Sequence, residues 1–271
     1  MPVTELVYTI IAYVFIFLFG ITIGSFLNVC IYRLPKEESL TKRNSHCMTC
    51  GSEIKRYDLI PVFSWLILRG KCRSCGAKIS PRYCIVEALN GILYVLTFMY
   101  YDFMYSPVKA ILVCLLLSAL IVVFFMDWDT QLISNYVVIF IGLLGVLDFL
   151  RWQFGVDRLF INDADLKSRI IGFFAVSLIL LVIELASKGK AMGRGDVYLM
   201  AAAGLFLGVK AIVAAFMIGL ITGSIAGIII KRCTGGSKFA FGPWLSLGIA
   251  VCAIWGNQLA DLYLKFAGFI Q

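Results

Sequence analysis

The sequence has one histidine, His46, among 271 residues, and only 15% of its residues are charged. A single histidine that lies in no apolar segment argues against Ser-His-Asp and Cys-His mechanisms, and against a catalytic metal site built from histidines. The scarcity of charge, together with 61% hydrophobic residues and a mean hydropathy of +0.92, excludes an ordinary soluble domain. The chain is expected to be an integral membrane protein whose acid–base chemistry comes from carboxylates.

Long apolar runs divide the chain into membrane-spanning segments. A helix that crosses a bilayer needs about 20 mostly apolar residues. The first run lacks the basic start and small-residue cleavage site of a signal peptide, so we interpret it as a retained helix. About eight transmembrane helices of an all-α polytopic protein are predicted, at residues 7–31, 84–101, 108–126, 133–150, 170–187, 197–209, 211–230 and 241–267.

One polar segment, residues 32–83, follows the first run and contains nearly half of the chain's 24 basic residues. Basic loops stay preferentially in the cytoplasm, so this segment is placed there, and alternation of the helices brings loops 127–132 and 188–196 to the same side. Three parts are predicted: a first helix (1–31), a cytoplasmic insert (32–83) and a seven-helix core (84–271). This topology accounts for the net charge of +8, and no nucleic-acid partner is expected.

Four cysteines of the insert form two matching pairs, Cys47 with Cys50 and Cys72 with Cys75, and a glycine follows each pair. Four thiolates in two such turns are the ligand set of a closed tetrahedral zinc site, which has a structural role. Two disulfides are the alternative, disfavoured in a reducing cytoplasm. His46 adjoins the first pair and is an alternative ligand, but it is expected to be an ordinary surface histidine.

A carboxylate, Asp196, stands at the start of an apolar run, just after Gly193 and Gly195. The glycines supply the backbone freedom to deliver this side chain to the first turn of a helix. The plain alternative is that Asp196 only caps the helix. A second carboxylate, Asp127, ends another apolar run, and the topology places both acids at the cytoplasmic face. Asp129 is an alternative to Asp127, but it is expected to be solvated.

Two aspartates within a few Å of each other cannot both ionise cheaply, so the pair shares one proton. The ionised member can deprotonate water while the protonated member polarises a carbonyl, which is metal-free peptide hydrolysis. The rival hypothesis is a proton-coupled transporter that uses Asp127, Glu184 and Asp196. Against the transporter, the polar residues are expected to gather at one face of the membrane, whereas a proton pathway needs some at mid-membrane.

Several motifs, in order along nearly the whole chain, resemble the bacterial type IV prepilin peptidases, which are membrane aspartic proteases of the Gly-x-Gly-Asp kind. The chain departs from the family pattern at Ser134, Tyr198 and Ala240, where the family usually or often has Pro, Lys and Pro, and these departures are expected to affect substrate handling. The matching segments are 24–29, 32–35, the cysteine pairs with 69–73, 79–83 leading to Glu87, 127–133, 193–196 and 241–244.

The resemblance implies that Asp127 and Asp196 are the catalytic pair. It also implies that the basic leader of prepilins and pseudopilins is cleaved after a glycine, at the cytoplasmic face of the bacterial inner membrane. Family members with the cysteine module commonly methylate the new amino terminus with S-adenosylmethionine, and Gly70 and Lys71 match positions associated with that activity. Methylation is implied by the resemblance alone.

Overall fold

A computed structural model describes residues 3–42, 45–159, 163–189, 192–234 and 239–266. These residues are predominantly helical and contain no strand, only two isolated β-bridges in the insert. The chain divides into two compact units, residues 1–97 and 98–271. The predicted all-α membrane architecture is confirmed.

The first unit consists of two long helices and the insert between them. α1 and α3 cross closely at glycines: a Cβ built on Gly20 would lie 2.8 Å from Cα of Gly91, and the Asn90 side chain donates a hydrogen bond to the Gly20 carbonyl at 2.7 Å. Small residues therefore set this helix crossing. The elements of this unit are α1 (Val3–Arg33), η1 (Leu34–Lys36), η2 (Arg56–Leu59), α2 (Phe63–Ile67) and the part of α3 (Arg82–Tyr101) up to residue 97.

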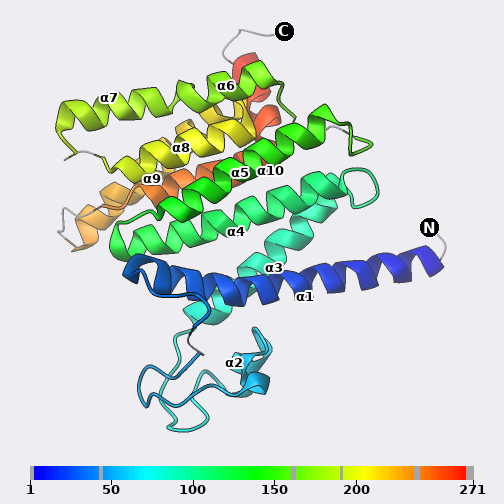
Figure 1. Cartoon of the computed structure of the whole chain (residues 1–271), viewed down its shortest axis with the longest axis vertical. Coiled ribbons are helices and arrows are strands. Elements are labelled where there is room, and N and C mark those ends of the chain that lie inside the picture. The colour runs from blue at the N-terminus through cyan, green and yellow to red at the C-terminus, as the bar shows by residue number, and fades with distance from the viewer. Residues whose placement is uncertain (1–2, 43–44, 160–162, 190–191, 235–238, 267–271) are drawn as a thin grey trace. The chain divides into compact units, whose positions relative to one another are not determined.

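The second unit is a bundle of helices (Figure 1). α10 packs along α9 and α4, α5 packs against α4 and α8, and α6 packs against α8. A Cβ on Gly172 of α6 would lie 2.7 Å from the carbonyl oxygen of Gly204 in α8, so glycines also permit this crossing. The helices are α4 (Pro107–Thr130), α5 (Asn135–Gln153), α6 (Leu166–Ala175), α7 (Ser177–Ser187), α8 (Arg194–Leu207), α9 (Val209–Thr234) and α10 (Gly242–Phe266).

Seven spans in the described residues are long and apolar enough to cross a membrane, when α6 and α7 count as one continuous segment. The remaining predicted span, 197–209, corresponds to α8, which has 14 residues. At 1.5 Å per residue α8 reaches about 21 Å, short of the roughly 30 Å hydrocarbon core. The predicted 170–187 helix is interrupted at Val176, and the predicted end at Ala267 lies outside the described residues.

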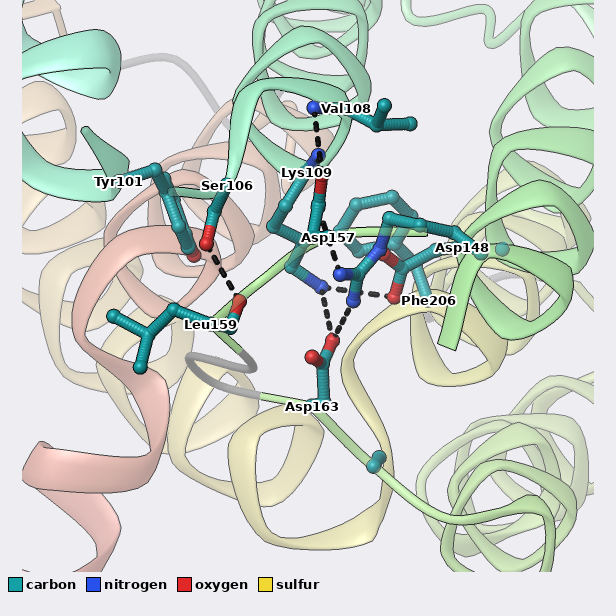
Figure 2. A network of polar contacts seen from close by, with 12 residues as sticks. Tyr101, Ser106, Val108, Lys109, Asp148, Asp157, Leu159, Asp163 and Phe206 are labelled. Atoms are coloured by element: carbon teal, nitrogen blue, oxygen red, sulfur yellow. Dashed lines mark hydrogen bonds and ion pairs between the residues drawn. The ribbon is translucent and has the colours of Figure 1, made fainter. Parts of the chain in front are cut away.

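A cluster of six buried charges joins helix ends in the second unit (Figure 2). Asp148 of α5 lies at its centre and accepts hydrogen bonds from Lys109 at 2.8 Å, Arg151 at 3.0 Å and Arg169 at 2.7 Å. Asp157 accepts the backbone N–H groups of Val108 and Lys109 in the first turn of α4, at 3.2 and 3.0 Å. The members are Lys109, Asp148, Arg151, Asp157, Asp163 and Arg169, so the cluster is electrically balanced.

The position of this cluster corrects one sequence expectation. Lys109 and Asp127 stand at opposite ends of α4, about 27 Å apart along the helix axis at 1.5 Å per residue. Buried polar residues therefore gather at both ends of the bundle, and the expectation that they gather at one face is wrong. The apolar runs gave no sign of the cluster, because its members come from short loops and helix ends distant in sequence.

Candidate active site

Asp127 lies in the last turn of α4. The helix ends where Gln131 adopts a left-handed conformation, with φ of 55°, and its N–H donates to the Asp127 carbonyl at 2.9 Å. The Asp127 residue is 6% exposed, whereas Asp129, two positions later, is exposed to solvent. Of the two candidate acids at this helix end, only Asp127 faces the protein interior.

Gly242, the first residue of α10, packs directly on the Asp127 carboxyl group. A Cβ at position 242 would lie 2.7 Å from Oδ2 of Asp127, so the first backbone N–H groups of α10 lie beside this carboxyl group. The free N–H groups at the start of a helix favour negative charge nearby. The start of α10 therefore both admits the carboxylate and stabilises its ionised form.

Asp196 is the third residue of α8 and is 7% exposed. Its N–H donates to the carbonyl of Gly193 at 3.2 Å, and Gly193, not Asp196, occupies the N-cap position. A Cβ at Gly195 would lie 2.9 Å from Cβ of Ile133, whereas a Cβ at Gly193 would meet only Oδ2 of Asp196, at 3.9 Å. Asp196 therefore does not occupy the N-cap position itself, and the two glycines have unequal steric roles.

Ile133 joins the segments that carry the two acids. Its side chain is the nearest neighbour of position 195, and its Cδ1 would also lie 3.2 Å from a Cβ at Gly242. The charge of Asp127 acts on Asp196, so the two carboxyl groups lie within electrostatic reach. Within the described residues, Oδ2 of Asp127 and Oδ1 of Asp196 have no hydrogen-bond partner. Two buried acids in this arrangement can hold one proton between them.

Glu184 supports the same loop. Arg194, the first residue of α8, donates from Nε to Oε1 of Glu184 at 3.0 Å; the carboxyl side chain is 7% exposed and the arginine side chain 73%. Glu184 lies near the end of α7 that precedes this loop. The three acids of the transporter hypothesis thus gather around one loop region and do not form a path across the bundle.

The four cysteines of the insert converge. All of their sulfur atoms lie within 4.8 Å of one another, and Sγ of Cys47 lies 3.9 Å from Sγ of Cys75. A tetrahedral site with Zn–S bonds of about 2.3 Å has S–S separations of about 3.8 Å, so the arrangement fits a metal ion. All four cysteines are free, so the disulfide alternative is not what the structure shows, and His46 does not belong to the cluster.

Both cysteine turns have the same backbone geometry. Cys47 N–H donates to the Ser52 carbonyl and Cys72 N–H donates to the Ala77 carbonyl, at 2.9 and 2.8 Å. Gly51 and Gly76 adopt φ of 70° and 71°, the left-handed region that glycine occupies without strain. These glycines are what let each turn close around its sulfur atoms.

The thiols of the cluster differ in their affinity for a proton. Backbone N–H groups of Cys50 and Thr49 lower the pKa of Cys47, and those of Cys75 and Ser74 lower the pKa of Cys72. For Cys75 the Ala77 backbone acts in the same direction, but hydrogen bonding to Cys50 and burial outweigh it and raise the pKa to about 11. Without a cation the cluster retains a proton, which a bound metal would displace.

Gly70 and Lys71 directly precede the second cysteine turn. Gly70 is buried with φ of 66°, and a Cβ there would lie 2.8 Å from Cζ2 of Trp65. Lys71 is exposed, and its backbone pairs with Lys78 in an isolated bridge. These two residues belong to the first unit and Asp127 and Asp196 to the second, so the structure describes two separate sets of residues.

The fold and these residues define a class: an integral membrane protein with a paired-aspartate site and a four-cysteine cluster that can hold a metal. Family comparisons agree with this class. A model of the bacterial peptidase A24 N-terminal domain matches residues 18–101, and a model of the type IV leader peptidase family matches residues 114–228.

Relatives named prepilin leader peptidase/N-methyltransferase are similar to most of the chain. The protein of Pseudomonas aeruginosa is 30% identical over 278 residues, covering 93% of each chain, and that of Neisseria gonorrhoeae is 32% identical over 84% of this chain and 85% of its own. The protein of Myxococcus xanthus is 34% identical over 82% of this chain, which spans only 64% of that protein. No solved structure matches. The chain therefore belongs to the type IV leader peptidase family, and the comparisons do not support the transporter hypothesis.

Proposed function

We propose that this protein removes the basic leader peptide of type IV prepilins and pseudopilins after a glycine, and methylates the amino terminus that cleavage exposes. The observation that carries the proposal is the buried pair of Asp127 and Asp196, in a chain whose relatives are named leader peptidases and N-methyltransferases.

In the proposed mechanism Asp127 and Asp196 act as one unit with a shared proton. The ionised carboxyl group accepts a proton from the attacking water, and the protonated one donates a hydrogen bond to the scissile carbonyl. The proton taken from water then passes to the leaving amine. Gly193 and Gly195 shape the supporting loop. Because the pair titrates together, its apparent pKa values belong to both acids.

We propose that Cys47, Cys50, Cys72 and Cys75 bind zinc in a structural site. Four thiolates fill a tetrahedral coordination shell, which leaves no position for water or substrate. On this proposal residues 32–83 form a metal-stabilised insert between the first helix, 1–31, and a membrane protease core, 84–271.

The proposed location is the bacterial inner membrane, surrounded by lipid, with the active site facing the cytoplasm. The support is the basic insert, because positive loops remain on the cytoplasmic side. A basic leader peptide is the expected partner there, and no nucleic-acid partner is proposed.

S-adenosylmethionine is the proposed methyl donor, and when bound it supplies the methyl group for the amino nitrogen. The proposal rests on the names of the relatives and on the match at Gly70 and Lys71. These two residues stand beside the cysteine cluster in the same compact unit.

The test uses the purified full-length protein with a prepilin, with and without S-adenosylmethionine, and reads the product by mass spectrometry. Cleavage after the leader glycine is expected in both samples, with one added methyl group only when the donor is present. Absence of cleavage contradicts the peptidase assignment, and cleavage without added methyl contradicts the methyltransferase assignment. Proton-coupled flux in liposomes with no cleavage would instead favour the transporter.

A further inference from the structure

The first unit contains a cavity of about 530 Å³ that the paired-aspartate chemistry does not use. Segments of the insert and the adjoining ends of α1 and α3 line it, and all of its lining residues lie between positions 25 and 87. Its volume lies within the range of about 300–1,000 Å³ typical of small-molecule sites. The cavity therefore has the capacity for a ligand larger than a metal ion.

Glu87 contributes a buried negative group to the wall. The residue is 9% exposed, and its Oε2 accepts the N–H of Val62 at 2.7 Å. Among the described residues no Lys or Arg forms an ion pair with Glu87. By contrast, Asp58, which also lines the cavity, accepts two hydrogen bonds from Arg73 at 2.8 and 2.6 Å. A buried carboxylate without a cationic partner favours a ligand that brings positive charge.

Asn28 supplies a second acceptor in the same wall. It is 5% exposed, and its side-chain nitrogen donates to the carbonyl of Tyr83 at 3.1 Å. Its Oδ1 is buried and has no hydrogen-bond partner within the described part of the chain. Leaving a buried acceptor unpaired costs about 1–3 kcal/mol, so this atom points to a ligand with an N–H or O–H donor.

Backbone strain is found at the same wall. Val62 has φ of 64° and ψ of −55°, a conformation that is rare for a β-branched residue, and Phe63 N–H donates to the Pro61 carbonyl at 2.6 Å. This tight three-residue turn directs the Val62 N–H to Glu87. Strain of this kind persists where the surrounding structure enforces it, often in ligand sites.

Aromatic rings complete the cavity. Tyr32 and Tyr83 stack with their ring centroids 5.3 Å apart, and Trp65 donates from its indole nitrogen to the Ile79 carbonyl at 3.3 Å. Gly70 lies behind Trp65, where any Cβ would collide with the indole ring. Gly70 does not line the cavity, yet a side chain there would displace a ring that does. A substitution at Gly70 would therefore alter the wall of the cavity without itself touching a bound ligand.

We propose that this cavity binds S-adenosylmethionine, with Glu87 and the Oδ1 of Asn28 facing its cationic and N–H groups and the aromatic residues packing on its adenine ring. The ligand carries a sulfonium charge, amino-group donors and a flat heterocycle, which match the carboxylate, the unpaired acceptor and the rings. The inference rests on the proposed methyltransferase activity and adds the site at which the donor binds.

The test measures binding directly, without turnover, by equilibrium dialysis of radiolabelled S-adenosylmethionine against the purified full-length protein. Glu87→Gln is expected to weaken binding at least tenfold, and to weaken S-adenosylhomocysteine less, because that product has no sulfonium charge. Asn28→Leu is expected to weaken both ligands. Glu5→Gln is the matched control: Glu5 is an exposed acid in the first turn of α1, outside the cavity, and wild-type binding is expected.

A second pair of variants tests the role of the indole ring. Gly70→Ala is expected to weaken donor binding, and combining it with Trp65→Phe, which removes the colliding part of the ring, is expected to restore part of the loss. Metal content, measured on every variant, reports whether the insert is folded.

Unchanged donor binding in Glu87→Gln and Asn28→Leu overturns the site, even if the protein methylates its substrate. Loss of prepilin affinity in these variants with donor binding intact also overturns it, in favour of a leader-peptide site. No donor binding by the wild-type protein overturns both this inference and the proposed methylation, while cleavage measured on the same preparation tests the peptidase separately.

Discussion

The backbone of Gly242 lies so close to the carboxyl group of Asp127 that a Cβ at position 242 would stand 2.7 Å from Oδ2. The start of α10 thus fixes one acid of the proposed pair by direct contact, from a part of the chain more than a hundred residues away. The glycine of the Phe-Gly-Pro segment at the start of this helix is therefore explained by the lack of space for a side chain beside Asp127.

Gly242→Ala should displace the Asp127 carboxyl group and lower the rate of prepilin cleavage. A misplacement of about 1 Å at a reacting group can cost about 100-fold in rate, so a loss of that order is expected. Gly142→Ala is the matched control, because a Cβ there would meet only Ala202, at an ordinary 3.9 Å. Equal cleavage rates in the two variants would show that the contact at Gly242 does not position the acid.

The two glycines before Asp196 should respond differently to alanine. Gly195→Ala forces a Cβ to within 2.9 Å of Ile133 and should shift the first turn of α8, with a large loss of cleavage. Gly193→Ala has ordinary contacts and a φ of −81°, which alanine adopts readily, so a loss of less than about tenfold is expected. The measurement is the steady-state cleavage rate of each folded variant. A larger loss at position 193 than at 195 contradicts this assignment.

Cys47→Ser and Cys72→Ser should each release the bound metal, because removing one of four thiolates opens the tetrahedral site. Elemental analysis of the purified protein measures this directly, and zinc is the expected metal. Cys233→Ser, which changes an exposed cysteine outside the cluster, should keep wild-type metal content. Purified wild-type protein that contains no zinc would refute the metal assignment.

Metal retention should also depend on pH. Protons compete with the metal for each thiolate, so the metal is held at neutral pH and released as the pH falls. The backbone N–H groups that lower the pKa of Cys47 and Cys72 stabilise their thiolates and move this release to more acidic conditions. Zinc content, measured after dialysis at each pH of a series, should fall only in the samples more acidic than neutral pH.

Asp148→Asn should destabilise the second unit. The change removes the anion that pairs with Lys109, Arg151 and Arg169 and leaves buried cations incompletely compensated. Breaking a buried ion pair from one side costs about 3–5 kcal/mol, so a clear fall in the midpoint of thermal unfolding in detergent is expected. Asp165→Asn changes an exposed acid outside the cluster and should leave the midpoint unchanged. An unchanged midpoint for Asp148→Asn would mean that the cluster does not stabilise the bundle.

Much of the membrane fold could be predicted from the sequence. Each long helix needs a long apolar run, whether its side chains face lipid or the protein interior, and such runs are visible in the sequence. The predicted 108–126 helix is α4, and the cysteine spacing placed the four sulfur atoms together. The sequence also predicts a membrane span at the short α8, because its apolar composition resembles that of the longer helices. What the sequence did not show is contact between distant segments: the charge cluster around Asp148, and the Val62 turn that meets Glu87.

The candidate site likewise combines residues that the sequence indicates with contacts that it does not. The sequence identifies Asp127 and Asp196 as candidates because each carboxylate borders an apolar run, which is a local signal. The contacts that hold them, through Ile133 and Gly242, depend on three-dimensional packing of α4, α8 and α10 and left no local pattern. The cavity around Asn28 was not predicted at all, because its lining residues look ordinary one by one.

The most direct test of the paired-aspartate claim measures prepilin cleavage by three single variants, Asp127→Asn, Asp196→Asn and Asp129→Asn, with folding checked by thermal unfolding and metal content. The account predicts no detectable cleavage for the first two, because an amide can neither accept the proton from water nor share it with its partner, and near wild-type cleavage for the exposed Asp129. Retained cleavage by folded Asp127→Asn or Asp196→Asn would contradict it.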